Sequence, residues 1–405
     1  MPEAVIVSTA RSPIGRAFKG SLASVRPDDL AAQMVAAALA KVPELDPNTI
    51  NDLMLGCGLP GGQQGFNMAR VVAVQLGYDA LPGTTITRYC SSSLQTTRMA
   101  LHAIKAGEGD VFLSAGVESV SSFAMGSSDS LPDTHNPLFA EAEARTATAA
   151  QGGLTWHDPR QDARIPDAYI AMGETAENVA QVTGITREEM DRWGVRSQNR
   201  AEAAIKAGFF EREITPVTLA DGTVVSKDDG PRAGTSYDTV SQLKPVFRPD
   251  GLITAGNACP LNDGAAALVI MSDTRAKELG LTPLARIVST GVSGLSPEIM
   301  GLGPIEASKR ALAIAGMSVS DIDLVEINEA FAVQVIGSAR ELGIDEDKLN
   351  VSGGAIAVGH PFGMTGARIT TTLLNNLSTH DGTFGLETMC VGGGQGMAMV
   401  LERLS

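Results

Sequence analysis

The order of secondary-structure elements is the feature that most constrains the fold, because a similar order occurs near both ends of the chain. Residues 4–116 alternate between strand-like and helix-like segments, and so do residues 285–402. Alternation of this kind is typical of α/β layering, in which helices cover the faces of a sheet. The two regions share element order but not residues, and they predict one α/β unit that is used twice.

The first region is expected to contain strands at 4–8, 52–56, 84–88 and 110–116 and helices at 27–41, 67–76 and 92–106. The second is expected to contain strands at 285–292, 324–327, 351–352, 384–390 and 397–402 and helices at 305–315, 330–342 and 365–377.

The middle of the chain has a different composition. Residues from about 120 to 250 are rich in Ser, Asp, Pro and Gly, with helices expected at 175–183 and 187–207. Thr186 and Glu189 have the spacing of a capping box at the start of the second helix. A strand at 266–271 would return the chain to the first unit. Long excursions in compact enzymes usually carry ligand contacts.

The length of the chain, 405 residues, exceeds what one hydrophobic core usually holds. Its 43% hydrophobic and 19% charged residues fit a globular protein. We therefore predict three parts. They are a first half formed by residues 1–119 and 251–275, a loop domain at 120–250 and a second half at 276–405.

Charge and cysteine content exclude several classes of function. The net charge of −15 and the lack of a basic stripe argue against a nucleic-acid partner. No apolar run is long enough for a membrane span, and the first residues lack the segments of a signal peptide. The four cysteines have neither a disulfide framework nor metal-ligand spacing. We expect a cytoplasmic protein without a metal site.

Three reactive side chains stand at turns made of small residues. Cys90 lies between a strand-like run and the helix start Ser-Ser-Ser at 91–93, where the helix dipole and free N–H groups lower a thiol pKa. His360 is the only one of five histidines in a glycine-dense turn, at 353–361. Cys390 precedes a loop with four glycines in five positions. Two thiols and an imidazole indicate covalent chemistry on a carbonyl.

Each of these residues also has a purely structural interpretation. A free cysteine mostly behaves as a buried hydrophobic residue, and a histidine can occupy an ordinary turn. The glycine loop after Cys390 leads into a strand rather than a helix, so it is not a dinucleotide-binding fingerprint. Asn328 follows the strand at 324–327, where α/β enzymes bind ligands, but it could equally be a helix N-cap.

The candidate residues belong to seven stretches that follow one another along the chain. These are Arg-Ser-Pro-Ile-Gly at 11–15, Cys-Ser-Ser-Ser-Leu-Gln at 90–95, Met-Gly-Glu-Thr-Ala-Glu-Asn at 172–178, Gly-Asn-Ala-Cys-Pro-Leu-Asn-Asp-Gly-Ala-Ala at 256–266, Asn-Glu-Ala-Phe at 328–331, Gly-Gly-Ala-Ile-Ala-Val-Gly-His-Pro at 353–361 with Gly-Ala-Arg at 366–368, and Cys-Val-Gly-Gly-Gly-Gln-Gly at 390–396. Over nearly its whole length the chain resembles the thiolases, the coenzyme A-dependent acyltransferases. The resemblance implies an α/β thiolase fold: two similar βαβαβαββ halves in a five-layer αβαβα arrangement with an inserted loop domain.

The resemblance also implies a division of labour in the site. Cys90 would carry the acyl group as a thioester, His360 would take the proton of Cys90, and Cys390 would be the acid and base at the substrate α-carbon. One oxyanion hole would be His360 with a water held by Asn328, and the other the N–H groups of Cys90 and Gly392. Coenzyme A would be a substrate and not a tightly bound cofactor. Its expected contacts are Arg232, Phe247, Met172, Thr239 and Cys259.

Several positions depart from the family pattern. Ser93 stands where a glycine is common, which predicts a tighter pocket floor. Cys259 replaces a serine, and a thiol is the weaker hydrogen-bond donor. The segment between residues 125 and 170 looks longer than in short-chain biosynthetic relatives, and Ala171 stands where those enzymes tend to carry His. Both features favour degradative cleavage of 3-ketoacyl-CoA to acetyl-CoA and a shortened acyl-CoA, as in fatty-acid β-oxidation.

Three alternative functions compete with this interpretation, and the residues present argue against the last two. The same site could form acetoacetyl-CoA as a biosynthetic acetyl-CoA acetyltransferase. A carrier-protein-dependent condensing enzyme would have a second histidine in place of Asn328. A non-catalytic acyl-CoA-binding protein would lack one of Cys90, His360 and Cys390. We also expect a homo-oligomer, either dimer or tetramer, and a possible hydratase/dehydrogenase partner.

Overall fold

The computed structural model describes residues 2–129 and 131–405, so the first residue of the predicted first half and one residue of the predicted loop domain lie outside it. Its strands form a sheet in the order β10-β11-β12-β9-β1-β8-β5-β3-β4, with β2 paired to β8. The strands are β1 (Ala4–Arg11), β2 (Gly15–Arg16), β3 (Asp52–Cys57), β4 (Gly83–Ile86), β5 (Val111–Ser119), β8 (Asn262–Ser272), β9 (Ala285–Gly294), β10 (Leu324–Ile327), β11 (Phe384–Val391) and β12 (Gln395–Arg403).

The two halves of the sheet meet at a very short pairing. β1 and β9 pair antiparallel through only two residue pairs, Val5 with Arg286 and Ile6 with Ala285. On one side of this joint lie β8, β5, β3 and β4, and on the other lie β12, β11 and β10. Each side contains both parallel and antiparallel neighbours. Two separately built sheets are therefore joined edge to edge by a minimal contact.

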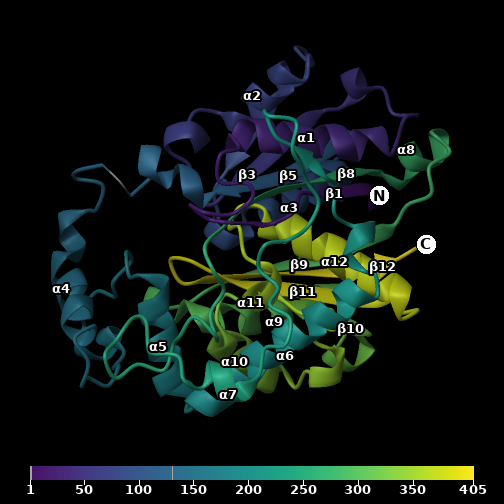
Figure 1. Cartoon of the computed structure of the whole chain (residues 1–405). Coiled ribbons are helices and arrows are strands. Elements are labelled where there is room, and N and C mark those ends of the chain that lie inside the picture. Colours follow the sequence, from purple (N-terminus) through teal and green to yellow (C-terminus); the bar gives the residue numbers. More distant parts are fainter. Residues whose placement is uncertain (1, 130) are drawn as a thin grey trace.

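Helices cover both faces of each half and produce five layers (Figure 1). The helices of the two halves are α1 (Pro27–Ala40), α2 (Met68–Gln75), α3 (Ser92–Ala106), α9 (Gly303–Ala315), α10 (Ala332–Leu342) and α12 (Thr365–Thr379). The pair α1 and α2 packs on the outer face of the first half, and α9 and α10 pack on the outer face of the second. Helices α3 and α12 lie between the halves. The αβαβα thiolase arrangement expected from the sequence is confirmed.

Residues within one strand alternate between two cores, as a pleated strand that is buried on both faces requires. In β8, Ala267 and Val269 belong to the outer core under α1, whereas Leu268 and Ile270 belong to the central core with α3 and α12. β12 divides in the same way between the central core and the core under α9 and α10. This double burial explains the continuous apolar runs of the sequence.

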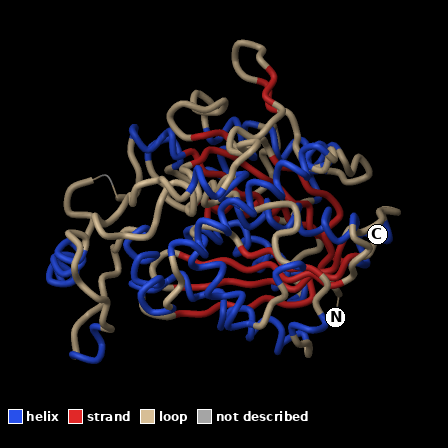
Figure 2. The backbone as a smooth tube through the Cα atoms, turned by 60° about the horizontal axis from the view of Figure 1, so that its bottom comes forward, coloured by secondary structure: helices blue, strands red, loops and turns tan. Residues whose placement is uncertain are grey.

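The excursion between β5 and β8 is mostly loop and carries several helices (Figure 2). It contains α4 (Ala140–Ala149), α5 (Met172–Thr183), α6 (Arg187–Lys206), the short α7 (Tyr237–Val240) and a small hairpin of β6 (Val217–Thr218) and β7 (Val224–Val225). The predicted capping box at the start of α6 is confirmed, since Glu189 N–H donates to Thr186 Oγ1 and Thr186 N–H donates to the Glu189 carboxylate. Three shorter elements, α8 (Asp273–Glu278), α11 (Ala355–Val358) and the 3₁₀ turn η8 (Pro297–Leu302), complete the connections used below.

The strand predicted at 351–352 is wrong. Leu349 makes a single parallel bridge to Val325 beside β10, and Asn350 then turns the backbone to a φ of 49°. The side chain of Asn350 continues the pairing, because its Oδ1 accepts from Ile327 N–H at 2.9 Å and its Nδ2 donates to Ile327 O at 2.9 Å. An asparagine side chain thus replaces the backbone of the expected strand.

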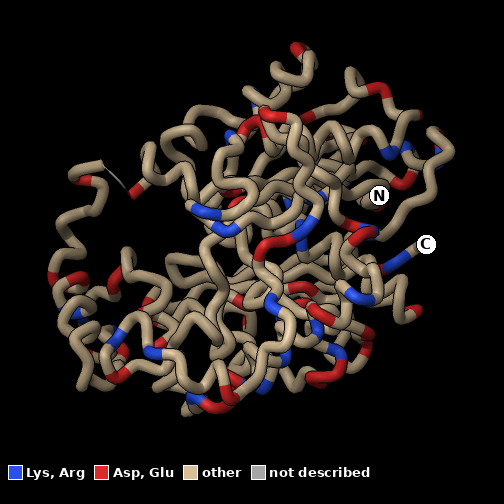
Figure 3. Tube along the Cα trace, in the orientation of Figure 1, with Lys and Arg blue, Asp and Glu red and all other residues tan. Residues whose placement is uncertain are grey.

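No helix within the described residues is both long and apolar enough to span a membrane. Lys and Arg residues are interspersed with Asp and Glu along the Cα trace, and the described part of the chain has no continuous basic track (Figure 3). An anionic ligand must therefore be bound by individual cations and N–H groups.

Candidate active site

Cys90 lies on the 3₁₀ turn η3 (Tyr89–Ser91) that leads directly into α3. The turn is held by serine hydroxyls: Ser92 Oγ donates to Tyr89 O at 2.7 Å and accepts from Arg88 N–H at 2.9 Å. Tyr89 adopts a φ of 43°, an uncommon value for a residue with a side chain. The strained turn directs the chain sharply from β4 into α3 and places the thiol at its apex.

The Cys90 thiol is protonated at neutral pH. Burial raises its pKa to about 12, the Gly392 N–H group opposes this rise, and the Glu118 carboxylate adds to it. The N–H group of Cys90 itself also favours the thiolate. Gly392 and Cys90 are the two residues predicted to form an oxyanion hole, and the structure places both N–H groups at the sulfur. The glycine loop after β11 therefore reaches the nucleophile turn.

His360 is buried, and its tautomer follows from its partners. Nδ1 lies 2.6 Å from Thr365 Oγ1, and the Thr365 hydroxyl donates its only proton to Pro361 O at 2.8 Å. Thr365 must then accept at Nδ1, so Nδ1 carries the proton and Nε2 is left as the base. Burial and the Arg368 charge lower the His360 pKa to about 3, which keeps the imidazole neutral.

Asn328 stands beside the imidazole. Its Nδ2 is 3.2 Å from Nε2 and 3.4 Å from Nδ1 of His360, so it contacts the ring between its two nitrogens. Its Oδ1 is buried and has no hydrogen-bond partner within the described residues. A buried carbonyl without a partner is well suited to hold a water molecule. The N-cap alternative is not realised, because α10 begins at Ala332 with Phe331 as its N-cap.

Three thiols lie within electrostatic reach of one another. Cys390 is fully buried in β11, and burial together with Cys90 and Cys259 raises its pKa well above the usual value. Burial, with a contribution from Cys90, raises the pKa of Cys259 to about 12. Cys259 N–H donates to Ala330 O at 3.0 Å, which fixes the Cys259 loop against the Asn-Glu-Ala-Phe stretch. All three thiols are therefore neutral in the resting site.

A cavity of about 390 Å³ opens in front of Cys90. Its walls combine apolar side chains from both halves and from the excursion with a few polar groups near its mouth. They are formed by Gly58, Leu59, Tyr89, Cys90, Asp129, His135, Ala168, Tyr169, Ile170, Ala171, Met172, Phe362, Gly392 and Gly393. The rings of His135 and Tyr169 stack with centroids 3.9 Å apart.

The structure brings together some of the expected coenzyme A contacts and not others. Met172 lines the cavity, and Cys259 is in electrostatic reach of Cys90. Phe247 contacts Phe331 edge to face, with ring centroids 6.3 Å apart. Arg232 and Thr239 are exposed and do not line the cavity. Their contribution to binding stays a prediction.

Ser93 does not form the pocket floor that the sequence suggested. It is fully buried behind the cavity wall, and its Oγ accepts from Ala367 N–H at 2.9 Å. The hydroxyl therefore joins α3 to α12 across the central layer. The expectation was wrong because only the backbone direction at the helix start, not the sequence, decides which serine of the 91–93 run faces the cavity.

Sequence reasoning missed two residues that orient the site. Thr365 fixes the His360 tautomer, and Glu118 accepts hydrogen bonds from the loops around the cavity. Thr365 gave no signal, since threonine at a helix start is common. Glu118 did give one, because it is the only charged residue in the strand Val111–Ser119.

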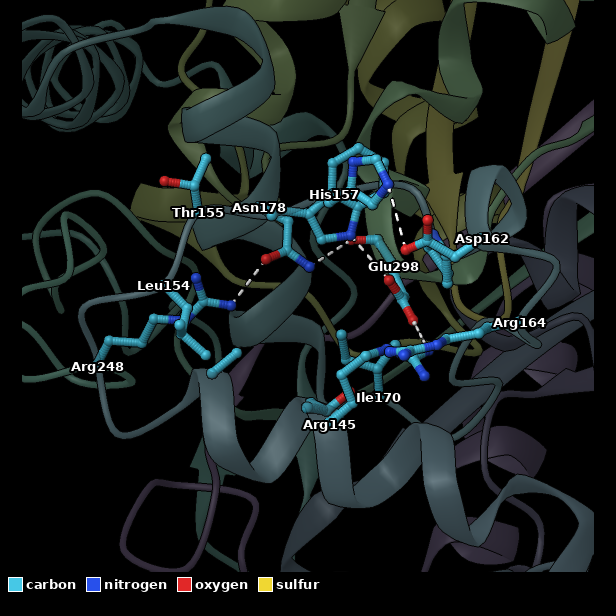
Figure 4. Close-up of a pocket in the computed structure, with 14 residues that line it drawn as sticks. Arg145, Leu154, Thr155, His157, Asp162, Arg164, Ile170, Asn178, Arg248 and Glu298 are labelled. Atoms are coloured by element: carbon cyan, nitrogen blue, oxygen red, sulfur yellow. Dashed lines mark hydrogen bonds and ion pairs between the residues drawn. The ribbon is translucent and has the colours of Figure 1, made fainter.

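A second, smaller cavity of about 180 Å³ lies behind Ile170, which lines both cavities. Figure 4 shows two ion pairs among its lining residues. Glu298 contacts Arg145 at 3.2 Å, and His157 contacts Asp162 at 3.4 Å. These pairs hold the excursion in place and leave little free charge for a ligand.

Residues 4–274 match the thiolase N-terminal domain, and residues 281–403 match the thiolase C-terminal domain. The chain therefore belongs to the thiolase family, a family of enzymes that transfer acyl groups.

Individual relatives cover the chain from end to end. It is 43% identical to the 3-ketoacyl-CoA thiolase of Bacillus subtilis (strain 168), over 99% of this chain and 100% of the relative. It is 42% identical to the 3-oxoadipyl-CoA/3-oxo-5,6-dehydrosuberyl-CoA thiolase and 41% identical to the acetyl-CoA acetyltransferase of Escherichia coli (strain K12), with full coverage on both sides. The crystal structure of the Bacillus anthracis acetyl-CoA acetyltransferase superposes with a TM-score of 0.87 at 39% identity, over 100% of this chain and 99% of that one.

Proposed function

We propose that this thiolase cleaves 3-ketoacyl-CoA with coenzyme A and releases acetyl-CoA and a shortened acyl-CoA. The observation that carries the proposal is a neutral Cys90 thiol that lines a cavity of about 390 Å³ and has Cys390 within electrostatic reach. The neutral His360 ring lies against Phe362 of the cavity wall, with ring centroids 5.2 Å apart. The volume falls within the range of about 300–1,000 Å³ that is usual for small-molecule sites, and it exceeds the needs of an acetyl group.

The first half-reaction follows from the protonation states. Nε2 of His360 takes the Cys90 proton as the sulfur attacks the substrate 3-keto carbon, and N–H groups or the imidazolium stabilise the oxyanion. The bond between C2 and C3 then breaks, and its electron pair goes to C2. Cys390 donates its proton to C2, which gives acetyl-CoA and leaves the acyl group on Cys90.

The second half-reaction restores the enzyme. The Cys390 thiolate takes the proton of an incoming coenzyme A thiol, whose sulfur attacks the acyl-Cys90 thioester. Collapse of the tetrahedral intermediate expels the Cys90 thiolate, which recovers its proton from His360. Thiolates suit both roles, because sulfur is a good nucleophile and a good leaving group. In this scheme Asn328 holds the water of the first oxyanion hole.

A series of 3-ketoacyl-CoA substrates of increasing length tests the direction and the specificity. We expect kcat/KM to persist or rise beyond acetoacetyl-CoA, because residues of the 126–170 segment extend the cavity wall. The series includes 3-oxoadipyl-CoA, since one relative is named for that substrate. Activity confined to the four-carbon substrate would favour the acetoacetyl-CoA-forming alternative, which the acetyl-CoA acetyltransferase relatives suggest.

Mass spectrometry after incubation with acyl-CoA tests the nucleophile. An acyl adduct is expected on Cys90, absent in Cys90→Ala and retained in Cys259→Ser. An adduct on another cysteine would contradict the assignment.

We further propose the wider setting expected from the sequence. The chain divides into residues 1–119 with 251–275, residues 120–250 and residues 276–405. Arg232, Thr239 and Phe247 contact the coenzyme, and the enzyme is a cytoplasmic homo-oligomer of fatty-acid β-oxidation that works beside a hydratase/dehydrogenase. Four free thiols agree with a reducing compartment.

A further inference from the structure

Glu118 is a buried carboxylate that the thiolysis scheme does not use. It lies near the end of β5 and is fully buried. Its Oε2 accepts from Gly58 N–H at 2.6 Å and from Gly363 N–H at 2.8 Å. Its Oε1 accepts from Leu59 N–H at 3.2 Å and from Gln64 Nε2 at 3.0 Å. The Cys57 thiol also donates to Oε1 at 3.8 Å. All five partners are donors, which is the pattern of an ionised carboxylate, and the N–H groups oppose the rise in the Glu118 pKa that burial causes.

Those donors come from two segments that form the cavity. Gly58 and Leu59 follow β3 and line the cavity, and Gly363 follows Phe362, which lines it from the opposite half of the molecule. Gly363 also lies inside the turn between His360 and Thr365, whose side chains are hydrogen-bonded. A single carboxylate therefore connects the acyl cavity to the turn that orients the catalytic base.

The junction around Glu118 has no spare room. A Cβ on Gly58 would lie 2.7 Å from Glu118 Oε2, 2.8 Å from Phe362 Cβ and 3.3 Å from Tyr89 O. A Cβ on Gly363 would lie 2.3 Å from Val117 O. The loop after β3, the histidine turn and the residue before the nucleophile thus meet at one point, and a shift of one would displace the others.

We propose that Glu118 is a positioning residue of the thiolase reaction, whose carboxylate fixes the loop at residues 58–59 and the turn at Gly363 so that His360 and Cys90 stay aligned at the acyl cavity. The expected loss of turnover depends on the proposed function, whereas the positioning of the two segments does not. The same carboxylate also acts on the nucleophile through its charge, because it disfavours the Cys90 thiolate. Burial is the larger cause of the raised Cys90 pKa, and the Glu118 charge adds to it.

Two substitutions separate the reach of the side chain from its charge. Glu118→Gln has nearly the same shape but no charge, and its amide turns an NH₂ group toward one pair of donors. Glu118→Asp keeps the charge but is one methylene too short to hold both segments. Each variant is assayed for thiolysis and for the rate at which iodoacetamide alkylates Cys90 from about pH 7 to about pH 12, a range that reaches the Cys90 pKa of about 12.

We expect both variants to lose about 10-fold or more in kcat, the effect of leaving one or more buried donors without a partner. In Glu118→Gln the alkylation of Cys90 should become faster and its pH midpoint should fall, because the opposing charge is gone. In Glu118→Asp the midpoint should stay where it is in the wild type. A residue that only supports the fold would slow turnover without moving the midpoint in either variant.

Glu387→Gln is the matched control. Glu387 is also fully buried, and its Oε1 accepts from Thr370 Oγ1 at 2.8 Å, but this partner does not line the cavity, whereas Gly58 and Leu59 do. It should leave both the turnover and the alkylation midpoint unchanged.

Wild-type kcat in Glu118→Asp, or an unshifted alkylation midpoint in Glu118→Gln, overturns the proposal. If Glu118→Gln does not fold, the kcat of Glu118→Asp decides alone. Alkylation of Cys90 requires no acyl-CoA, so a wild-type protein inactive in thiolysis would refute the proposed function and leave the midpoint comparison intact.

Discussion

At the scale of single residues, the nucleophile and the base proposed for thiolysis are both neutral in the resting protein. A pKa of about 12 for Cys90 and of about 3 for His360 means that proton transfer between them is unfavourable until substrate is bound. The substrate oxyanion that forms on attack faces N–H groups and the new imidazolium, and these interactions exist only after the transfer. Separation of charge is thus coupled to bond formation rather than completed in advance.

The Thr365 hydroxyl is expected to matter through the tautomer of His360. Thr365→Val has almost the same shape but removes the acceptor for Nδ1–H, which leaves a buried donor unpaired and allows the wrong nitrogen to face Cys90. We expect kcat for thiolysis to fall about 10-fold to 100-fold, as for an unpaired buried donor of about 1–3 kcal/mol. Thr365→Ser keeps the hydroxyl and should retain most of the activity, and equal loss in the two variants would contradict this role.

Asn328→Asp should change the pH dependence of the reaction. A carboxylate beside the imidazole favours its protonated form, so the His360 pKa should rise from about 3 by roughly 1–3 units. His360 acts as the base only when neutral, and the acid limb of kcat/KM against pH should therefore move upward. Asn328→Ala removes the amide without adding charge. It should lower the rate without moving the acid limb of kcat/KM against pH. The same acid limb in both variants would rule out the electrostatic explanation.

The sequence could predict the residues that perform chemistry better than those that orient them. Cys90 and His360 stand at turns whose small residues are visible in the sequence, and Cys390 lies near the end of β11 before the glycine loop. The structure brings Cys390 and the Gly392 N–H group to Cys90, and Asn328 to His360. Glu118 and His360 lie far apart in sequence, and their connection through Gly363 exists only after the halves pack. A hydrogen bond over such a separation leaves no local pattern.

At the scale of elements, prediction succeeded where both ends of a helix carry a signal. The helix expected at 92–106 is observed as Ser92–Ala106, with serines at its start and Gly107 at a φ of 74° as its C-cap. The two-residue strands β2, β6 and β7 were not predicted, because two residues are too few for a periodic pattern. The pairing of these short strands depends on where the long excursion between β5 and β8 brings the chain back.

Glu298 on the turn η8 should control how firmly the excursion is held. Its carboxylate accepts from Arg145 Nη2 at 3.2 Å, Trp156 Nε1 at 2.8 Å and Asp167 N–H at 2.9 Å, which come from three separate parts of the excursion. Glu298→Ala removes the acceptor of all three donors. Arg145 keeps Glu141 and the Ile165 carbonyl, so we expect a loss of about 1–3 kcal/mol, as for a buried donor left without a partner. We expect faster amide hydrogen exchange across residues 140–170 and an unchanged rate in the central sheet.

The control for this experiment is Glu306→Ala on α9. Glu306 pairs with Lys309 at 3.5 Å at the surface, and exposed pairs contribute little. It should leave exchange across residues 140–170 unaltered. Faster exchange throughout the molecule in Glu298→Ala would mean a general loss of stability and not a local release.

At the scale of the whole molecule, the two ends of the sheet differ. β10 ends one side, where the Leu349 bridge and the Asn350 side chain cover it. β4 ends the other side and is a terminal strand with half-buried residues throughout. A terminal strand offers backbone groups to another chain unless something protects it, and symmetric dimers often form by pairing such edges.

An exposed aromatic residue stands beside β4. Phe66 is 92% exposed, and the next residue, Asn67, donates from Nδ2 to Gly83 O at 2.7 Å, which places the ring near the strand edge. A phenylalanine so exposed next to an open edge indicates an interface. We therefore expect the β4 edges of two copies to meet across a two-fold axis with Phe66 in the contact.

Phe66→Asp should weaken this dimer, because a carboxylate would be buried in the contact without a partner. Light scattering coupled to gel filtration, over a dilution series, should show a dimer for the wild type and a dissociation constant at least about 30-fold higher for the variant, which corresponds to a hot-spot loss of about 2 kcal/mol. Ile314→Asp is the control, since Ile314 is 68% exposed on α9 in the other half and should not affect the dimer. A monomeric wild type, or a dimer that Phe66→Asp does not weaken, would place the interface elsewhere or remove it.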